Sequence, residues 1–182
     1  APGLFVVAST LLILVTARAE QASRPAPAPS HRSWSAYGGG PEQIRYSRLD
    51  QINRSNVKQL HQAWIYDSGE TGGLQTQPIV VDDVLFGITP SHKTFAVRAA
   101  TGEHLWTFDS GIRARGANRG LMYWSDGRDD KRVYAAVTRY VYALDVRTGK
   151  PVPTFGDNGR IDLHKDLGRD PERQSVVLTS PG

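Results

Sequence analysis

Short stretches of apolar and β-branched residues, separated by turn residues, recur along the chain between residues 77 and 144. Stretches of four to eight residues bounded by Gly, Asp or Asn predict strands, since helices need longer runs with a wider apolar spacing. The pattern predicts strands over residues 77–81, 84–88, 94–97, 104–108, 120–124, 132–137 and 140–144. Short turns join successive strands, so we expect antiparallel sheets built in sequence order.

An internal repeat refines this prediction. Residues 95–106 are similar to residues 142–153, and the matching alanines, Ala96 and Ala143, lie 47 residues apart. A repeat of this length made of strands and turns is typical of a β-propeller blade. The small alanines allow close approach of neighbouring strands, and the Thr-Gly turn of each copy supplies a glycine that tolerates positive φ.

The two copies differ at the position of a tryptophan. Trp106 in the first copy offers a large flat surface for packing between adjacent blades. Pro153 stands at the matching position of the second copy. We therefore expect the second blade to lose one aromatic contact with its neighbour.

The first 33 residues do not continue the strand pattern. Residues 4–15 are mostly apolar, and Ala17 and Ala19 give the small-x-small pattern that precedes signal-peptidase cleavage. Such a run spans roughly 18 Å as a helix, short of a bilayer of about 30 Å, so an uncleaved anchor is the weaker alternative. We expect residues 1–19 to be a signal peptide lacking its start, and residues 20–33 to be a Pro/Ala-rich linker.

The composition and charge of the chain exclude several kinds of site and partner. The chain has no cysteine, which excludes disulfides and thiolate metal sites within it. The net charge is +4, but the acidic residues are interleaved and no basic helix is visible, so no nucleic-acid partner is expected. The five histidines are scattered without metal-ligand spacing and are expected to be polar or solvated side chains.

The repeat resembles the tryptophan docking motif, Ala-x-Asp-x-x-Thr-Gly-x-x-x-Trp, of the eight-bladed quinoprotein dehydrogenases that use pyrroloquinoline quinone (PQQ). Arg98 stands where the first copy would carry the motif's Asp, and Asp145 keeps it in the second. Further segments resemble the same family in order: residues 34–39, 46–64, 118–124, 154–163, 167–171 and 179–182. The resemblance implies an all-β fold in which residues 34–182 form the N-terminal portion, about two to three blades, of an eight-bladed β-propeller.

The resemblance also implies a cofactor-binding role for three residues. Arg119 lies in an Asn-Arg-Gly motif whose arginine sits beside the quinone carbonyls in the family, and its planar fork of donors suits carboxylate and quinone oxygens. Its alternative is a surface arginine, which we weigh against the cost of burying an unpaired guanidinium. Gln75 stands where the family usually has glutamate, and Thr179 matches a threonine that contacts the cofactor, although either could be an ordinary strand residue.

The resemblance places the intact protein among periplasmic PQQ-dependent dehydrogenases, with association with the membrane left open. The segments after residue 153 and the lack of a cysteine pair before Asn-Arg-Gly favour a sugar or polyol, glucose-like, over simple alcohols. Ubiquinone or a periplasmic cytochrome would accept the electrons. The Ca²⁺ ligands and the general base are expected downstream, so this chain would hold no catalytic or metal-binding residue and would be inactive alone. The alternative is a non-catalytic periplasmic propeller scaffold of the outer-membrane assembly type.

Overall fold

The computed structural model describes residues 33–168, 170 and 173–181. The predicted signal peptide, residues 1–19, and residues 20–32 of the predicted linker lie outside the described residues and stay predictions. Within the described part of the chain, no helix is long and apolar enough to cross a lipid bilayer. The remaining description concerns the unit that begins at residue 31.

The first of two sheets contains four antiparallel strands in sequence order. They are β1 (Ile79–Val81), β2 (Val84–Ile88), β3 (Thr94–Arg98) and β4 (His104–Phe108). Asp82 and Asp83, with φ of 49° and 62°, form the two-residue turn between β1 and β2. Such a turn requires positive φ at both central residues, which aspartate tolerates. All four strands of this sheet were predicted from the sequence.

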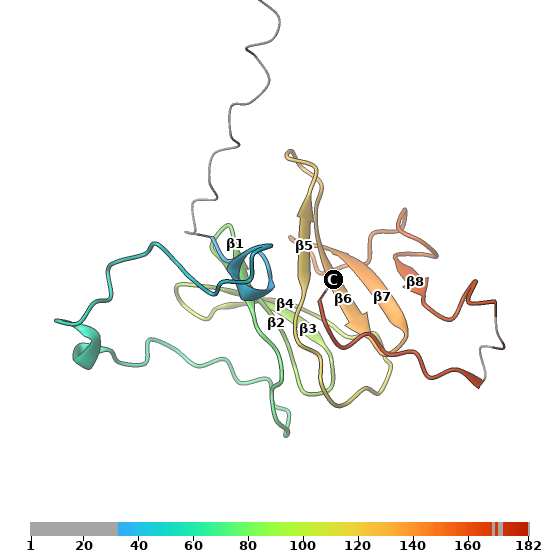
Figure 1. Ribbon diagram of the computed structural model, residues 1–182, viewed down its shortest axis with the longest axis horizontal. Helices are drawn as coiled ribbons and strands as arrows, with labels where there is room; N and C mark the ends of the chain where they lie inside the picture. Colours follow the sequence, from blue (N-terminus) through green and yellow to red (C-terminus); the bar gives the residue numbers. More distant parts are fainter. Residues whose placement is uncertain (1–32, 169, 171–172, 182) are drawn as a thin grey trace, which may run out of the picture. The chain divides into compact units, whose positions relative to one another are not determined.

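The second sheet repeats the arrangement with strands β5 to β8, again antiparallel and in sequence order (Figure 1). They are β5 (Met122–Ser125), β6 (Lys131–Val137), β7 (Tyr140–Asp145) and β8 (Arg160–Asp162). The first three were predicted from the sequence, and β8 was not. Two four-stranded sheets in succession confirm the expected all-β, blade-like architecture.

The fourth strand of the second sheet is interrupted. The amide of Val152 donates to the carbonyl of Ala143 (2.8 Å), so the chain returns beside β7 directly after the Thr-Gly turn. The chain then leaves the sheet and rejoins it at Gly159, whose carbonyl accepts from the amide of Ala143 (3.0 Å). Pro153 lies in this excursion, at the position that matches Trp106. The outer edge of the second sheet therefore differs from that of the first in structure as well as in sequence.

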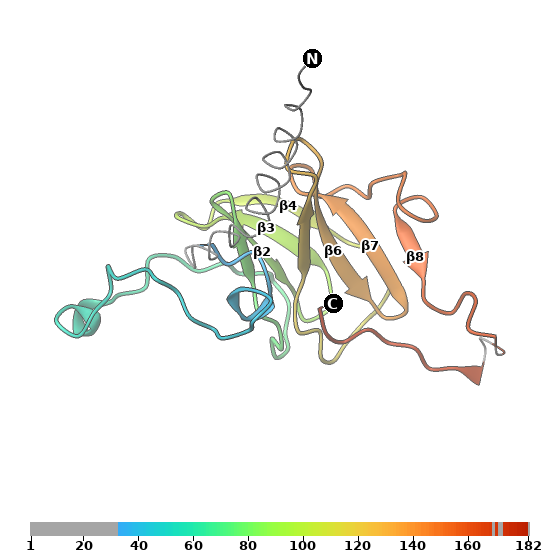
Figure 2. The same cartoon turned by 45° about the horizontal axis from the view of Figure 1, so that its top comes forward.

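Residues before β1 form an irregular arm with two short 3-10 turns, η2 (Tyr37–Gly39) and η3 (Val57–Gln59), and the part around η3 extends away from the sheets (Figures 1 and 2). The arm is anchored to β1 where the amide of Val80 donates to the carbonyl of Trp34 (2.8 Å). It is anchored again at Trp64, whose indole Nε1 donates to the carbonyl of Ala99 (3.1 Å).

Trp106 joins the two sheets. Its side chain is buried, and its Nε1 donates to the carbonyl of Val146 (3.0 Å), just beyond β7. A Cβ on Gly149 would lie 2.4 Å from the indole, so the ring rests directly on this glycine, whose φ is 67°. Trp64 lies over Gly102 in the same way, with φ of 74° at the glycine. The predicted roles of Trp106 and of the Thr-Gly turns are confirmed.

The buried apolar side chains form one cluster that draws on both sheets and on the connection between them. Its largest members are Ile79, Phe86, Ile88, Trp106, Leu121, Tyr142 and Leu144. Figures 1 and 2 show the two sheets next to each other, joined by the connection from β4 to β5. That connection, residues 109–121, carries Arg119.

Candidate functional site

Arg119 lies where three distant segments meet. Its carbonyl accepts from the amide of Gln77 (3.0 Å), and its amide donates to the carbonyl of Thr179 (2.9 Å). These main-chain hydrogen bonds place residues that precede β1, precede β5 and follow β8 side by side. The guanidinium Nη1 of Arg119 then donates to the hydroxyl Oγ1 of Thr179 (3.3 Å). The structure therefore brings together two of the three residues that the resemblance assigned to the cofactor.

The side chain of Arg119 is exposed, and no carboxylate among the described residues forms an ion pair with it. The exposure removes the burial cost that was weighed against the alternative of a surface arginine, because the side chain extends from a loop at the edge of the sheets. The cofactor role of Arg119 stays a prediction. The main chain of Arg119 is fixed by hydrogen bonds, one nitrogen of its guanidinium donates to the Thr179 hydroxyl, and its other N–H groups are available to a ligand.

Gln75 lies apart from this pair. It is exposed and lines a cavity of about 550 Å³ together with Gly73, Ser91, Arg115 and Gly116. The cavity thus has one wall from the chain before β1, one from the turn between β2 and β3, and one from the connection that carries Arg119.

Gln77, which sequence reasoning did not single out, holds the neighbouring chain in place. Its side-chain Oε1 accepts from the amide of Gly38 (2.8 Å) while its own amide bonds to Arg119. A Cβ on Gly120 would lie 3.0 Å from the carbonyl of Gln77, so glycine at this position permits the close approach. The glycine of the Asn-Arg-Gly motif was therefore a usable signal for this contact.

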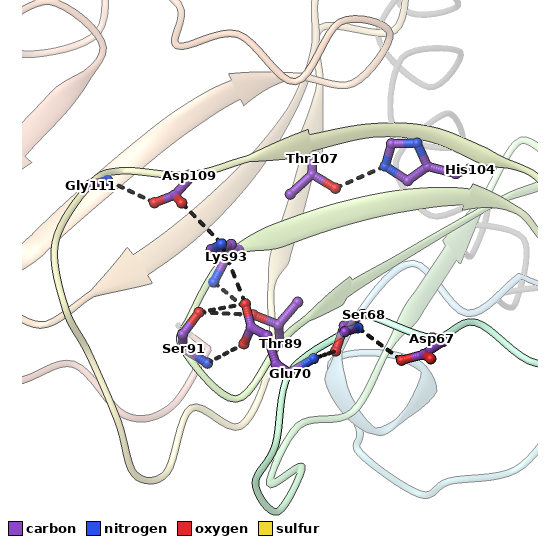
Figure 3. A network of polar contacts seen from close by, with 11 residues as sticks. Asp67, Ser68, Glu70, Thr89, Ser91, Lys93, His104, Thr107, Asp109 and Gly111 are labelled. Carbon is purple, nitrogen blue, oxygen red and sulfur yellow. Dashed lines mark hydrogen bonds and ion pairs between the residues drawn. The ribbon is translucent and has the colours of Figure 1, made fainter.

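A polar network stabilises the cavity wall formed by the β2–β3 turn (Figure 3). The Glu70 carboxylate accepts from the amide (2.9 Å) and the hydroxyl (2.7 Å) of Ser91. Lys93 lies 3.6 Å from Glu70 and 3.2 Å from Asp109. These contacts join the loop before β1, the β2–β3 turn and the end of β4.

The network explains the direction of two pKa shifts. Burial raises the pKa of the Glu70 carboxyl, but the hydrogen bonds from Ser91, with help from Thr89 and Lys93, outweigh it and leave the pKa below its usual value. The amide of Gly111, followed by Lys93, lowers the pKa of Asp109. Both groups are therefore carboxylates at neutral pH.

Two buried polar side chains fasten the connection between β4 and β5. Asn118, 4% exposed, donates from Nδ2 to the carbonyl of Ala136 in β6 (2.8 Å). His92, 5% exposed, has its Nε2 3.3 Å from the carbonyl of Gly116. Of the two expectations for the histidines, polar or solvated, His92 meets the first and not the second, because the β4–β5 connection covers its ring. Only the motif around Asn118 gave a sequence signal for either contact.

No metal centre is visible in the part of the chain that the structure describes. Among those residues, no three His, Asp or Glu side chains gather closely enough to hold a metal ion. The chemistry that the described site can perform is binding. Arg119 and Thr179 offer an exposed guanidinium and a hydroxyl at one place, and Gln75 offers an amide from the wall of a separate cavity. All three groups suit a ligand with carboxylate or carbonyl oxygens.

Comparisons with known proteins agree with one another. A family model described as PQQ, glucose/ethanol/alcohol dehydrogenase, beta-propeller domain, matches residues 34–182. The dehydrogenase subunit of alcohol dehydrogenase (quinone) from Komagataeibacter europaeus is 38% identical over 128 residues, which is 66% of this chain and 17% of that protein. Quinoprotein glucose dehydrogenase A from Acinetobacter calcoaceticus is 29% identical over 198 aligned positions, covering 88% of this chain and 25% of that protein.

A solved structure gives the same result for the fold. The quinohemoprotein alcohol dehydrogenase from Comamonas testosteroni superimposes with a TM-score of 0.69 at 28% identity, covering 86% of this chain and 22% of that one. The chain thus spans about a quarter or less of the length of these relatives. The predicted fold class, part of a β-propeller of the quinoprotein type, is confirmed.

Proposed function

This chain belongs to the PQQ β-propeller family of glucose, ethanol and alcohol dehydrogenases, and from that membership we propose that it forms the cofactor-facing first blades of an exported sugar or polyol dehydrogenase. The observation that carries the proposal is the hydrogen bond between the side chains of Arg119, which precedes β5, and Thr179, which follows β8. Support for a sugar or polyol comes from the chain after residue 153, which resembles the glucose and polyol branch, and from the likeness to a glucose dehydrogenase.

The residues present fit the cofactor. Arg119 has five N–H donors, and the hydroxyl of Thr179 occupies one of its nitrogens. An exposed guanidinium with no carboxylate partner among the described residues can bind a carboxylate or quinone oxygen without first breaking an ion pair. Thr179 and Gln75 add a hydroxyl and an amide, neither of which repels an anion.

Each residue then has a defined task. When bound, PQQ supplies the two-electron acceptor for oxidation of the substrate carbon. Arg119 holds the oxygen-bearing edge of the cofactor and stabilises negative charge there. Thr179 orients the guanidinium through Oγ1, and the backbone bonds at Arg119 fix the point from which the side chain extends. Gln75 acts from the cavity wall by donating or accepting through its amide.

The rest of the proposal concerns the whole protein. Residues 1–19 would direct export to the periplasm, and residues 20–33 would link the cleavage point to the propeller. The Ca²⁺ ligands and the general base would come from blades beyond this chain. Ubiquinone or a periplasmic cytochrome would take up the electrons.

The test is PQQ binding by the full-length protein, followed through quenching of tryptophan fluorescence. Arg119→Lys keeps the charge but loses the planar fork, so we expect the dissociation constant of PQQ to rise about 30-fold. Arg113→Lys is the matched control, since Arg113 is an exposed arginine of the same connection. It should change the constant by less than about twofold.

Each outcome is informative. A wild-type protein that does not bind PQQ would support the non-catalytic scaffold, and equal effects of the two lysine variants would remove Arg119 from the site. Glucose-dependent and ethanol-dependent dye reduction by the reconstituted protein would decide the substrate. A higher kcat/KM for ethanol would contradict the sugar or polyol proposal while leaving the cofactor site intact.

A further inference from the structure

His92 occupies an unusual backbone position. It lies two residues before β3 with φ of 66°, in the left-handed region that costs energy for residues other than glycine. The turn is locked around it, because the amide of His92 donates to the carbonyl of Thr89 (2.9 Å) and the amide of Lys93 donates to the hydroxyl of Thr89 (3.1 Å). The imidazole is therefore presented by a rigid turn.

The ring makes one directed contact. Its Nε2 lies 3.3 Å from the carbonyl oxygen of Gly116. A carbonyl oxygen only accepts hydrogen bonds, so the geometry assigns the proton to Nε2. Nδ1 is buried and faces no hydrogen-bond partner among the described residues. The turn of the first sheet thus holds, through a single hydrogen bond, the connection that leads into the second sheet.

Gly116 lies in the middle of that connection. Its φ is 99°, and a Cβ built on it would meet no atom within 4 Å, so no neighbouring side chain or backbone stands where its side chain would be. Arg115 and Gly116 line the cavity that contains Gln75, and Arg119 follows three residues after Gly116. The hydrogen bond from His92 therefore holds the backbone of a residue that has no side chain of its own to fasten it.

A second fastening acts from the other side. Asn118 donates from a buried Nδ2 to the carbonyl of Ala136, near the end of β6 in the second sheet. Asn118 immediately precedes Arg119. The connection is thus fixed to the first sheet through His92 and to the second sheet through Asn118, with both side chains buried beneath it.

We propose that His92 and Asn118 are positioning residues that together hold residues 115–119 so that Arg119 meets its ligand in the correct place. The inference rests on the proposed function, since the ligand is PQQ. Neither residue touches the ligand in this proposal. Their contribution is to reduce the freedom that the arginine would otherwise lose on binding.

The experiment compares two amides at position 92 in the full-length apoprotein. His92→Gln places an N–H donor at about the reach of Nε2, whereas the shorter side chain of His92→Asn cannot reach Gly116. Asparagine tolerates the left-handed backbone better than glutamine does. A role of the hydrogen bond and a role of the backbone therefore predict opposite orders of the two variants.

We expect His92→Asn to raise the dissociation constant of PQQ about tenfold and His92→Gln to leave it within about threefold of wild type. The melting temperature of each apoprotein, measured without PQQ, separates binding from stability. The opposite order, or a loss of melting temperature in both variants with unchanged PQQ affinity, would overturn the proposal.

Asn118→Ala keeps the test decisive if His92→Asn does not fold. It should weaken PQQ binding about tenfold and speed hydrogen exchange of residues 112–120 in the apoprotein. Unchanged affinity in Asn118→Ala would contradict the two-point fastening. Failure of the wild-type protein to bind PQQ would instead reject the proposed function, so the two failures are distinguishable.

Discussion

Replacing Gly149 by alanine tests whether the docked indole of Trp106 holds the two sheets together. The new Cβ would lie 2.4 Å from Cε3 and 2.6 Å from Cδ2 of the ring. These atoms belong to a rigid indole that is 8% exposed and is tied through Nε1 to the carbonyl of Val146. A shift of a few tenths of an ångström would not relieve these contacts, so we expect the indole to move out of its packed position over residue 149.

The magnitude follows from the interactions that the displaced indole gives up. At φ of 67°, alanine costs about 1 kcal/mol in backbone strain. Undocking breaks the Nε1 hydrogen bond, about 1 kcal/mol, and removes part of the packing of a buried indole, whose full truncation costs about 3–5 kcal/mol. We therefore expect the indole to add about 3 kcal/mol to the backbone cost.

Gly127→Ala is the matched control. Gly127 has φ of 80°, but a Cβ there would meet nothing within 4 Å, so only the backbone cost applies. Hydrogen-exchange mass spectrometry of the full-length protein can follow residues 94–108 and 140–150 in both variants. A difference of about 3 kcal/mol in opening free energy corresponds to exchange about 100-fold faster in Gly149→Ala.

Two results would refute the reasoning. Equal exchange in the two alanine variants would mean that the indole yields without cost. The second result concerns the double variant Trp106→Ala/Gly149→Ala. Without the indole, the added cost of the alanine at position 149 should fall to that of Gly127→Ala, because the clash is gone. A persistent increment would place the strain elsewhere.

Two electrostatic predictions concern the edges of the first sheet. The pKa of Glu70 lies below its usual value of 4.5, so the stability that its carboxylate contributes is fully present above about pH 4.5 and is lost as the pH falls through the folded-state pKa. Glu70→Gln should therefore lower the melting temperature at pH 7, and the difference should shrink toward pH 3; a difference independent of pH would contradict the role of the charge. Asp82 pairs with Lys131 of the second sheet, but the side chains are 66% and 35% exposed. Asp82→Asn should change the unfolding free energy by less than about 1 kcal/mol, and a larger loss in denaturant titration would show that this pair, rather than the indole, joins the sheets.

The strands up to β7 could be predicted from the sequence because their signals are local. Apolar stretches and turn residues such as Asp82 and Asp83 lie within a few positions of each other. β8 (Arg160–Asp162) escaped prediction because three residues carry no periodicity and their pairing is set by β7. The excursion that begins at Pro153 also separates β8 from the residues at 151–152 that first pair with β7.

The site was predictable only in part, for a different physical reason. Arg119 and Thr179 were identified through the resemblance, but their contact spans 60 residues and depends on main-chain pairing between segments that are irregular in sequence. The burial of His92 could not be predicted, because it depends on what covers the ring, and the covering connection lies 24 residues away in the sequence. Such contacts are properties of the assembled sheets and leave no trace in a local pattern.

The docking of Trp106 on the second sheet also bears on the order in which the two sheets are completed during synthesis. The indole belongs to the first sheet, but its acceptor, the carbonyl of Val146, lies 40 residues later in the chain. The acceptor of the Trp64 indole, the carbonyl of Ala99, likewise lies 35 residues later in the chain. While the chain emerges from the ribosome, the first sheet therefore keeps Trp106 uncovered until the turn after β7 has been made, so the second sheet completes the first.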